Sequence, residues 1–204
     1  MQSYMKSAMP FLGVPAPAMR RSVRAALAAH PLDPGDWRAA VLTLWREAAY
    51  REERYAALEL AHRYRRHATA ADLALYEELV TTGAWWDYVD SVAHLVGDLL
   101  RTHPEPIRAA MLVWSRDDDM WRRRVSIICQ LGFREETDLD LLFACIEPSL
   151  GRPEFFLRKA IGWALRDLAW SSPAEVERYV RENAARLSPL SVREATKHLA
   201  RLLS

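Results

Sequence analysis

The chain has 204 residues, of which 50% are hydrophobic and 27% are charged, so it can bury a sizeable core and is not a disordered chain. Glycine is scarce at seven residues, which argues against a dinucleotide-binding sheet protein and against an all-β fold with frequent turns. The 28 basic and 27 acidic residues give a net charge of +1, and this total does not by itself indicate a nucleic-acid binder.

The basic residues are dominated by arginine, because only Lys6, Lys159 and Lys197 are lysines. Arginine favours planar, bidentate contact with carboxylates or phosphates, so anion recognition is one interpretation. The alternative is a GC-rich genome, which enriches arginine and alanine together. The positions of the arginines in the fold have to decide between the two.

The two cysteines, Cys129 and Cys145, lie in apolar stretches, and the sequence shows no signal peptide. We therefore expect reduced thiols and a cytoplasmic location rather than a disulfide framework. No apolar run reaches the roughly 18 residues that a membrane span needs, so no membrane partner is expected. No cluster of His, Cys and Asp has metal-ligand spacing, and no cofactor motif is present, so we expect neither a metal nor a cofactor.

Short segments rich in Pro, Gly, Ser and Thr divide the chain into helices of roughly 10–16 residues, without a linker long enough to separate domains. In chain order these breaks fall at residues 31–35, 67–69, 81–83, 103–106, 132–136, 148–153, 171–173 and 188–189. We therefore expect one all-α domain over residues 1–204. Helices of this length in series indicate pairs, and pairs indicate a repeat.

Five segments align without gaps at starting positions 53, 88, 122, 157 and 192, so the period is 34 or 35 residues. They read ERYAALELAHRY, YVDSVAHLVGDL, RRRVSIICQLGF, LRKAIGWALRDL and VREATKHLARLL. Their fourth and eighth positions are small or apolar and predict a buried stripe. A helix-pair repeat of this length is typical of α-solenoids, which curve around a concave surface.

The third position of each segment is polar or charged instead. It holds Tyr55, Asp90, Arg124, Lys159 and Glu194. We expect these side chains to form a row across the concave groove. Residues four positions apart share a helix face, which adds Trp86 one turn before Asp90 and Trp163 one turn after Lys159. A carboxylate would then lie among two indoles and two cations.

Five blocks of the sequence are distinctive. They are YMKSAMPFLGVPAPAMR at 4–20, WWDYVDSVAHLVGD at 85–98, MWRRRVSIICQL at 120–131, EFFLRKAIGWALRD at 154–167 and LSPLSVREATKHL at 187–199. With them the chain resembles the bacterial alkylpurine DNA glycosylases built from HEAT-like repeats, the AlkD type, over nearly its whole length. The resemblance implies hydrolysis of the N-glycosidic bond of N3-methyladenine and N7-methylguanine in duplex DNA, without base flipping.

The resemblance also implies roles for particular residues. Asp90 in WWDYVD matches the family's catalytic carboxylate, Trp86 and Trp163 match its two sugar-contacting tryptophans, and Arg124 matches an arginine that contacts the DNA backbone. We add Lys159 as a phosphate contact. Further candidates for DNA contact are Arg166, Tyr4 and Lys6, followed by Arg54, Arg158, Arg193 and Lys197. We expect a monomeric, monofunctional enzyme whose partner is duplex DNA containing alkylated purines, bulkier adducts included.

Ordinary structural roles compete with these assignments. The remaining tryptophans are expected in the core, namely Trp37, Trp45, Trp85, Trp114, Trp121 and Trp170. Asp90 could cap a helix or pair with Arg124. Because Arg122, Arg123 and Arg124 point in three directions on a helix, we expect at least one of them to be an ordinary solvated charge.

Two other functions remain open at this point. A non-catalytic protein that binds branched or damaged DNA would keep the groove and lose the chemistry, and a protein-binding scaffold is the commonest use of helical repeats. One departure from the family pattern concerns the affinity for DNA. Members usually carry another helix before the YMK block, whereas only three residues precede Tyr4 here. If that helix is absent, we expect one side of the groove to be more open.

Overall fold

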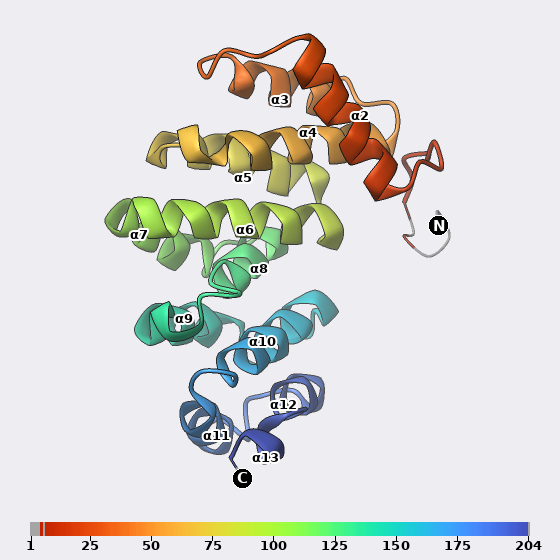
Figure 1. Cartoon of the computed structure of the whole chain (residues 1–204). Coiled ribbons are helices and arrows are strands. Elements are labelled where there is room, and N and C mark those ends of the chain that lie inside the picture. Colours follow the sequence, from red (N-terminus) through yellow and green to blue (C-terminus); the bar gives the residue numbers. More distant parts are fainter. Residues whose placement is uncertain (1–4, 6, 204) are drawn as a thin grey trace. The chain divides into compact units, whose positions relative to one another are not determined.

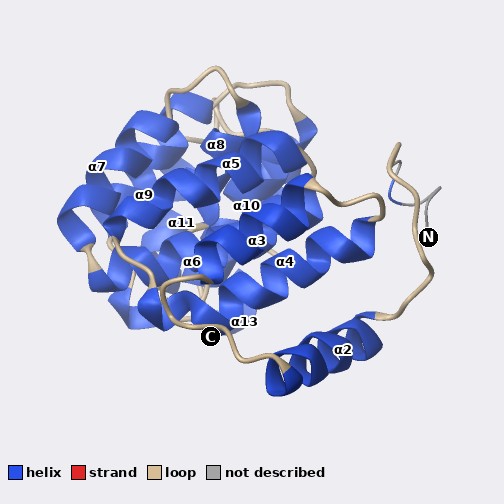
Figure 2. Cartoon of the chain, turned by 90° about the horizontal axis from the view of Figure 1, so that it is seen from above, coloured by secondary structure: helices blue, strands red, loops and turns tan. Residues whose placement is uncertain are grey.

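A computed structural model describes Met5 and residues 7–203, and every regular element within that range is helical (Figures 1 and 2). Helices follow one another in pairs, so the chain is an all-α protein of the α-solenoid type, as the repeat predicts. The chain divides into two compact units, Met1–Leu75 and Tyr76–Ser204, and each is described by itself below. A single domain over residues 1–204 stays a prediction.

Within the described residues, the first unit contains three complete α-helices and two short 3-10 turns. These elements are α2 (Ala16–Ala29), α3 (Trp37–Arg46), α4 (Arg51–Tyr64), η1 (Arg65–His67) and η2 (Ala70–Asp72). α3 packs along α4 and buries Trp37, Val41 and Trp45, which lie four residues apart and so form one stripe. α2 packs on α4 as well, but it buries none of its residues. The core of this unit therefore lies between α3 and α4.

The second unit begins within α5 (Leu73–Gly83) and contains the rest of the repeats. Its other elements are α6 (Trp86–Thr102), α7 (Pro104–Trp114), α8 (Met120–Ile128), η3 (Arg134–Glu136), α9 (Leu139–Ile146), η4 (Glu147–Ser149), α10 (Phe155–Leu168), α11 (Pro173–Glu182), α12 (Pro189–Ala195) and α13 (Leu199–Leu202). The helices α6, α8, α10 and α12 pack successively on one another, and α7 packs on α9. The aligned segments thus coincide with the second helices of the pairs, which confirms the 35-residue period.

The last aligned segment departs from the expected continuous helix. α12 ends at Ala195, and a turn separates it from the short α13. Glu194, the residue of that segment in the polar column, still lies within α12.

Two glycines allow these stacked helices to approach closely. A Cβ atom at Gly97 in α6 would overlap the carbonyl oxygen of Cys129, and one at Gly162 in α10 would lie 2.6 Å from the Cβ atom of Glu194. Any larger residue would push the neighbouring helices apart. Glycine therefore sets the spacing of the α6–α8 and α10–α12 pairs, and this spacing determines which side chains reach across from helix to helix.

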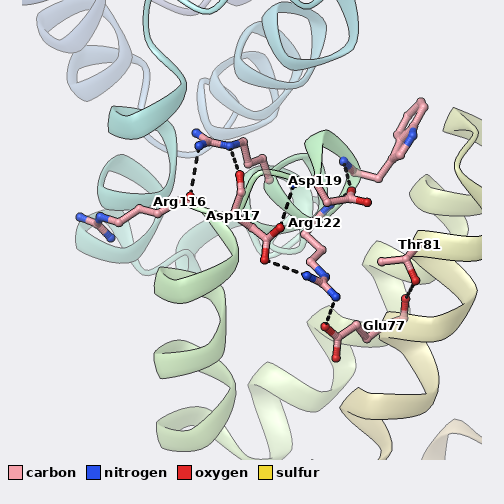
Figure 3. Close-up of polar contacts among 8 residues, drawn as sticks. Glu77, Thr81, Arg116, Asp117, Asp119 and Arg122 are labelled. Atoms are coloured by element: carbon pink, nitrogen blue, oxygen red, sulfur yellow. Dashed lines mark hydrogen bonds and ion pairs between the residues drawn. The ribbon is translucent and has the colours of Figure 1, made fainter.

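The three consecutive arginines of α8 bind three different parts of the second unit. Arg122 forms ion pairs with Asp117 (2.8 Å) and Glu77 (2.6 Å), as Figure 3 shows. Arg123 donates to the backbone carbonyls of Arg116 and Asp117 and to that of Pro148 (3.0 Å). All three arginines thus have protein partners. The expectation of a solvated charge among them is wrong, because the loop between α7 and α8 folds back over the start of α8.

The start of α8 has a well-formed cap. The Asp119 carboxylate accepts hydrogen bonds from the backbone N–H groups of Trp121 (2.7 Å) and Arg122 (3.1 Å), and this residue type is favoured at the helix N-terminus. The Asp117 carboxylate accepts in turn from the Asp119 N–H at 2.8 Å. The cap fixes where α8 begins and therefore the direction in which the Arg124 side chain leaves the helix.

Candidate active site

Asp90 of α6 and Arg124 of α8 form a bidentate ion pair between stacked helices. Arg124 Nε lies 2.7 Å from Asp90 Oδ1, and Arg124 Nη2 lies 2.8 Å from Asp90 Oδ2. Two parallel N–H···O bonds of this kind fix the plane of the carboxylate as well as its position. The row predicted from the repeat therefore brings these two residues into direct contact, and the pairing that the sequence left open is present.

The ion pair is largely withdrawn from solvent, with side-chain exposures of 15% for Asp90 and 5% for Arg124. Burial raises the pKa of the Asp90 carboxyl above its ordinary value, although the hydrogen bonds and charge of Arg124 act in the opposite direction. The positive potential of His94 lowers this pKa further, whereas Asp87 raises it. Burial has the larger effect on this pKa, so the ionised form of Asp90 is less favoured than it would be in water, and Arg124 partly offsets this effect.

The guanidinium of Arg124 has a third partner at the start of α10. Arg124 Nη1 donates to the backbone carbonyl oxygen of Phe156 at 2.6 Å, and the guanidinium carbon lies 5.9 Å from the centre of the Phe156 ring. This ring packs against Trp121 and Trp85, with centroid separations of 5.0 and 5.6 Å. The aromatic cluster thus supports the carbonyl that orients Arg124. No motif in the sequence marks a backbone carbonyl, so this partner was not predicted.

Lys159 and Arg166 of α10 converge on one carboxylate of α12. Lys159 Nζ lies 2.9 Å from Glu194 Oε1, and Arg166 Nη1 lies 2.5 Å from Glu194 Oε2. The hydrogen bond from Lys159 and the positive charges of Lys159 and Arg166 hold the pKa of Glu194 below its ordinary value. The predicted row included Glu194 without a role. Its position one period after Lys159 was the available signal.

Trp86 and Trp163 are half-buried and lie on the helices that carry the two ion-pair groups. Trp86 begins α6 one turn before Asp90, and Trp163 lies in α10 one turn after Lys159. Neither indole is fully covered by protein. Each residue therefore keeps part of its surface accessible to solvent.

The other tryptophans divide between core and surface. Trp37, Trp45, Trp114 and Trp121 are buried, as expected. Trp85 is half-buried in the aromatic cluster. Trp170 is 45% exposed and contacts His198 and Arg201, so its assignment to the core is wrong. It follows the end of α10, where no later helix covers it completely.

The remaining candidates for DNA contact are spread over the fold. Tyr4 and Lys6 lie outside the described residues. Arg193 and Lys197 are exposed and Arg158 is half-buried. The guanidinium of Arg54 stacks over the Trp45 ring at 4.6 Å, which indicates a packing role within the first unit. Among the described ones, Arg158, Arg193 and Lys197 do not join the ion pair of Asp90 and Arg124.

Among Met5 and residues 7–203, no group of three or more His, Cys, Asp or Glu side chains is arranged to hold a metal ion. Within the same range, no helix combines the length and the apolar character that a membrane crossing requires.

Comparison with known proteins places this geometry in a family. The profile described as "DNA alkylation repair enzyme" matches residues 1–199. The chain belongs to this family. A solved structure titled "Predicted DNA alkylation repair enzyme from Enterococcus faecalis" is similar to it, with 30% identity and a TM-score of 0.90, over 98% of this chain and 93% of that chain. No curated protein matches the sequence.

Membership of the DNA alkylation repair enzyme family gives the protein a role in the repair of alkylated DNA. It also indicates DNA as the substrate. The match extends across both compact units, and so do the blocks on which the resemblance rests.

Proposed function

We propose that this family member is a monofunctional DNA glycosylase that removes cationic alkylated purines, such as N3-methyladenine and N7-methylguanine, from duplex DNA without base flipping. The observation that carries the proposal is the partly buried Asp90 carboxylate, fixed by both nitrogens of Arg124. In a protein that only bound DNA, a carboxylate at this position would repel phosphates and would serve only to orient Arg124.

The chemistry asks for an anion beside the sugar. When an alkylated purine carries a positive charge, the C1′–N bond can break with its electron pair moving onto the base, which leaves neutral. Positive charge then develops on the deoxyribose ring, and water adds to C1′ and loses a proton. A carboxylate already in position stabilises that developing charge without having to reorganise. Asp90 supplies the charge and can accept the proton from water.

Arg124 has two effects on this carboxylate. Its bidentate hydrogen bonds hold Asp90 ionised despite burial and fix its orientation. The Phe156 carbonyl takes one further N–H group, so donors remain on the terminal nitrogens of Arg124 for a DNA phosphate. We therefore infer that Arg124 positions Asp90 first and contacts the backbone second.

The two indoles complete the environment of the sugar. Trp86 and Trp163 have electron-rich faces that attract a cation by about 0.5–2 kcal/mol each. Packed against deoxyribose, they would favour the charged transition state and exclude water from Asp90. Lys159 and Arg166 would hold flanking phosphates, exchanging Glu194 for a phosphate oxygen, and this contact fixes the strand without reading its sequence.

Selectivity follows from the leaving group. A neutral base such as uracil or hypoxanthine would need an acid to protonate it, and the site assembled around Asp90 contributes no such group. We therefore expect release of N3- and N7-alkylpurines and little release of uracil or hypoxanthine. We also expect an intact abasic site, because Lys159 pairs with Glu194 in the free protein and would pair with a phosphate in the complex, so it is not placed to attack the sugar as a Schiff-base nucleophile.

The deciding experiment measures base release from duplexes containing N-methylated purines, a bulky N7-alkylguanine, uracil or hypoxanthine. Wild type is compared with Asp90→Asn and with Asp98→Asn, a matched control two turns further along α6. The proposal is supported if Asp90→Asn loses base release and Asp98→Asn retains it. Uracil release at a comparable rate, or DNA binding without release of any base, would contradict it, and the latter would favour a non-catalytic DNA-binding protein.

A further inference from the structure

The cationic residues near the amino terminus are not balanced by acidic ones. Residues 1–32 contain no aspartate or glutamate, and their basic residues are Lys6, Arg20, Arg21 and Arg24. Because the net charge of the whole chain is +1, the chain after this segment is net acidic. A neutral total therefore conceals a basic region, and α2 carries three of its four charges.

α2 makes few contacts with the rest of its unit. None of its residues is buried, and it lies at the periphery of the first unit, against α4 (Figure 2). The side that packs consists of Met19, Val23 and Leu27, which are half-buried and lie four residues apart. This narrow stripe accounts for one side of the helix and leaves most of its circumference in solvent.

The opposite side of α2 presents the arginines. Arg21 and Arg24 are exposed, and within the described residues no hydrogen bond or ion pair engages them. Arg20 lies at the edge, 59% exposed, with Nε 3.6 Å from Glu59 Oε2. Residues three apart on a helix have Cβ atoms about 5–6 Å from one another, so Arg21 and Arg24 can bind neighbouring anions.

The residues around these arginines are small. Ser22, Ala25 and Ala28 are exposed on the same helix and would not hold a partner away from the helix backbone. An amphipathic helix that lies on a membrane would instead expose large aliphatic or aromatic side chains for insertion. The combination of unpartnered arginines and small neighbours fits an extended polyanion better than a lipid surface.

We propose that the exposed face of α2 binds the phosphate backbone of duplex DNA through Arg21 and Arg24, as a contact region additional to the residues of the candidate active site. The proposal rests on the proposed function for the nature of the polyanion. The contacts would be independent of base sequence and of damage, because guanidinium groups on phosphates carry no information about the bases. They would add to affinity and leave the chemical step unchanged.

The test measures binding of undamaged duplex DNA as a function of salt for wild type and the double variant Arg21→Gln/Arg24→Gln. Each phosphate contact contributes about 0.9 to the slope of log K against log salt concentration. Loss of two contacts should reduce the slope by about 1.8 and weaken binding at least about tenfold at 0.1 M salt. Arg21→Lys/Arg24→Lys keeps both charges and should keep most of the slope.

The matched control is Arg66→Gln/Arg181→Gln, which removes two exposed arginines of η1 and α11 and changes the net charge equally. Its slope should equal that of wild type. An equal decrease in the two double variants would reduce the effect to net charge and overturn the proposal. An unchanged slope in the α2 variant, with unchanged helicity by circular dichroism, would overturn it too, as would binding to anionic phosphatidylserine vesicles with no effect on DNA binding.

The same variants separate this proposal from the proposed function. If wild type releases base but the α2 variant keeps the wild-type salt slope, the α2 contact is overturned and the proposed function is not. A reduced slope in a protein that releases no base supports the α2 contact and contradicts the glycosylase. Single-turnover release at saturating DNA should be the same in wild type and in the α2 variant, because these arginines do not touch the reacting atoms.

Discussion

Two ion-pair sites in the second unit contain residues of the same sequence column, Asp90 with Arg124 and, two periods later, Lys159 with Glu194, and they differ in the exposure of their cations. Asp90 binds Arg124 with little solvent access, and its pKa is raised. Glu194 is 18% exposed, close to the 15% of Asp90, but its partners Lys159 and Arg166 remain 37% and 25% exposed, and its pKa is lowered. Both carboxylates have cationic partners between stacked helices, yet their pKa values are shifted in opposite directions.

The difference shows what burial adds to a charge pair. At the Glu194 site, two partly hydrated cations outweigh a modest loss of hydration, so the ionised form is favoured. At the Asp90 site, desolvation outweighs one guanidinium, so the ionised form is held at a cost. An anion of this kind interacts strongly with a developing cation, because little water screens it. We therefore propose that Asp90 takes part in the chemistry and that Lys159 and Arg166 exchange Glu194 for DNA phosphates.

The largest expected contrast is in catalysis. Asp90→Asn should reduce base release by about two orders of magnitude or more, the size typical for removal of one preorganised electrostatic group. Glu194→Gln should leave the single-turnover rate within about threefold of wild type, because it touches the proposed phosphate contacts and not the sugar. Single-turnover release of N7-methylguanine from duplex DNA measures both variants. Equal losses of rate in the two would contradict the different roles proposed for Asp90 and Glu194.

The next contrast is in stability. Arg124→Gln leaves a buried carboxylate without its cation and should lower the free energy of unfolding by about 3 kcal/mol. Glu194→Gln leaves partly exposed cations and should cost about 1 kcal/mol or less. Urea unfolding with a common slope gives both numbers. The proposed difference in burial fails if the two losses are the same.

A third contrast concerns the pH dependence of activity. If Asp90 acts ionised, kcat/KM falls as the pH drops through its pKa, and because that pKa is raised the fall lies above the ordinary aspartate value of about 3.9. Arg124→Lys retains one cation but loses the bidentate contact, so the fall should move to higher pH. A profile of kcat/KM from pH 4 to 8 with a cationic substrate measures the shift. An unchanged pH profile of kcat/KM in Arg124→Lys would contradict an effect of Arg124 on the protonation of Asp90.

The smallest contrast is in the pH dependence of stability. Asp90 has a raised pKa in the folded state, so its contribution to stability is present at low pH and is lost as the pH rises through that pKa. Glu194 has a lowered pKa, so its contribution is present above about 4.5 and is lost as the pH falls. Between pH 3 and 7, the stability difference between wild type and Asp90→Asn should decrease with pH, whereas the difference for Glu194→Gln should increase. Parallel curves would contradict the opposite shifts.

Much of the fold could be predicted from the sequence, because each repeat packs on its neighbours in the same way and so needs the same types of residue at the same positions. A gapless period of 34 or 35 residues, with small or apolar residues at two positions, located the second helices and placed Asp90, Arg124, Lys159 and Glu194 in one column. Such a column predicts a shared face, since each repeat contacts mainly its neighbours. The blocks around Trp86 and Trp163 added the resemblance to a DNA repair family, which the comparison confirms.

Only the tertiary structure decided which members of that column meet and in what surroundings. Helix spacing, set by Gly97 and Gly162, determines that Arg124 reaches back to Asp90 while Lys159 reaches forward to Glu194. The Phe156 carbonyl became a partner through packing of its ring on Trp121, which no local pattern records. The sequence determined the residues and their order, but burial, and with it the sign of each pKa shift, depends on atoms that distant segments bring together.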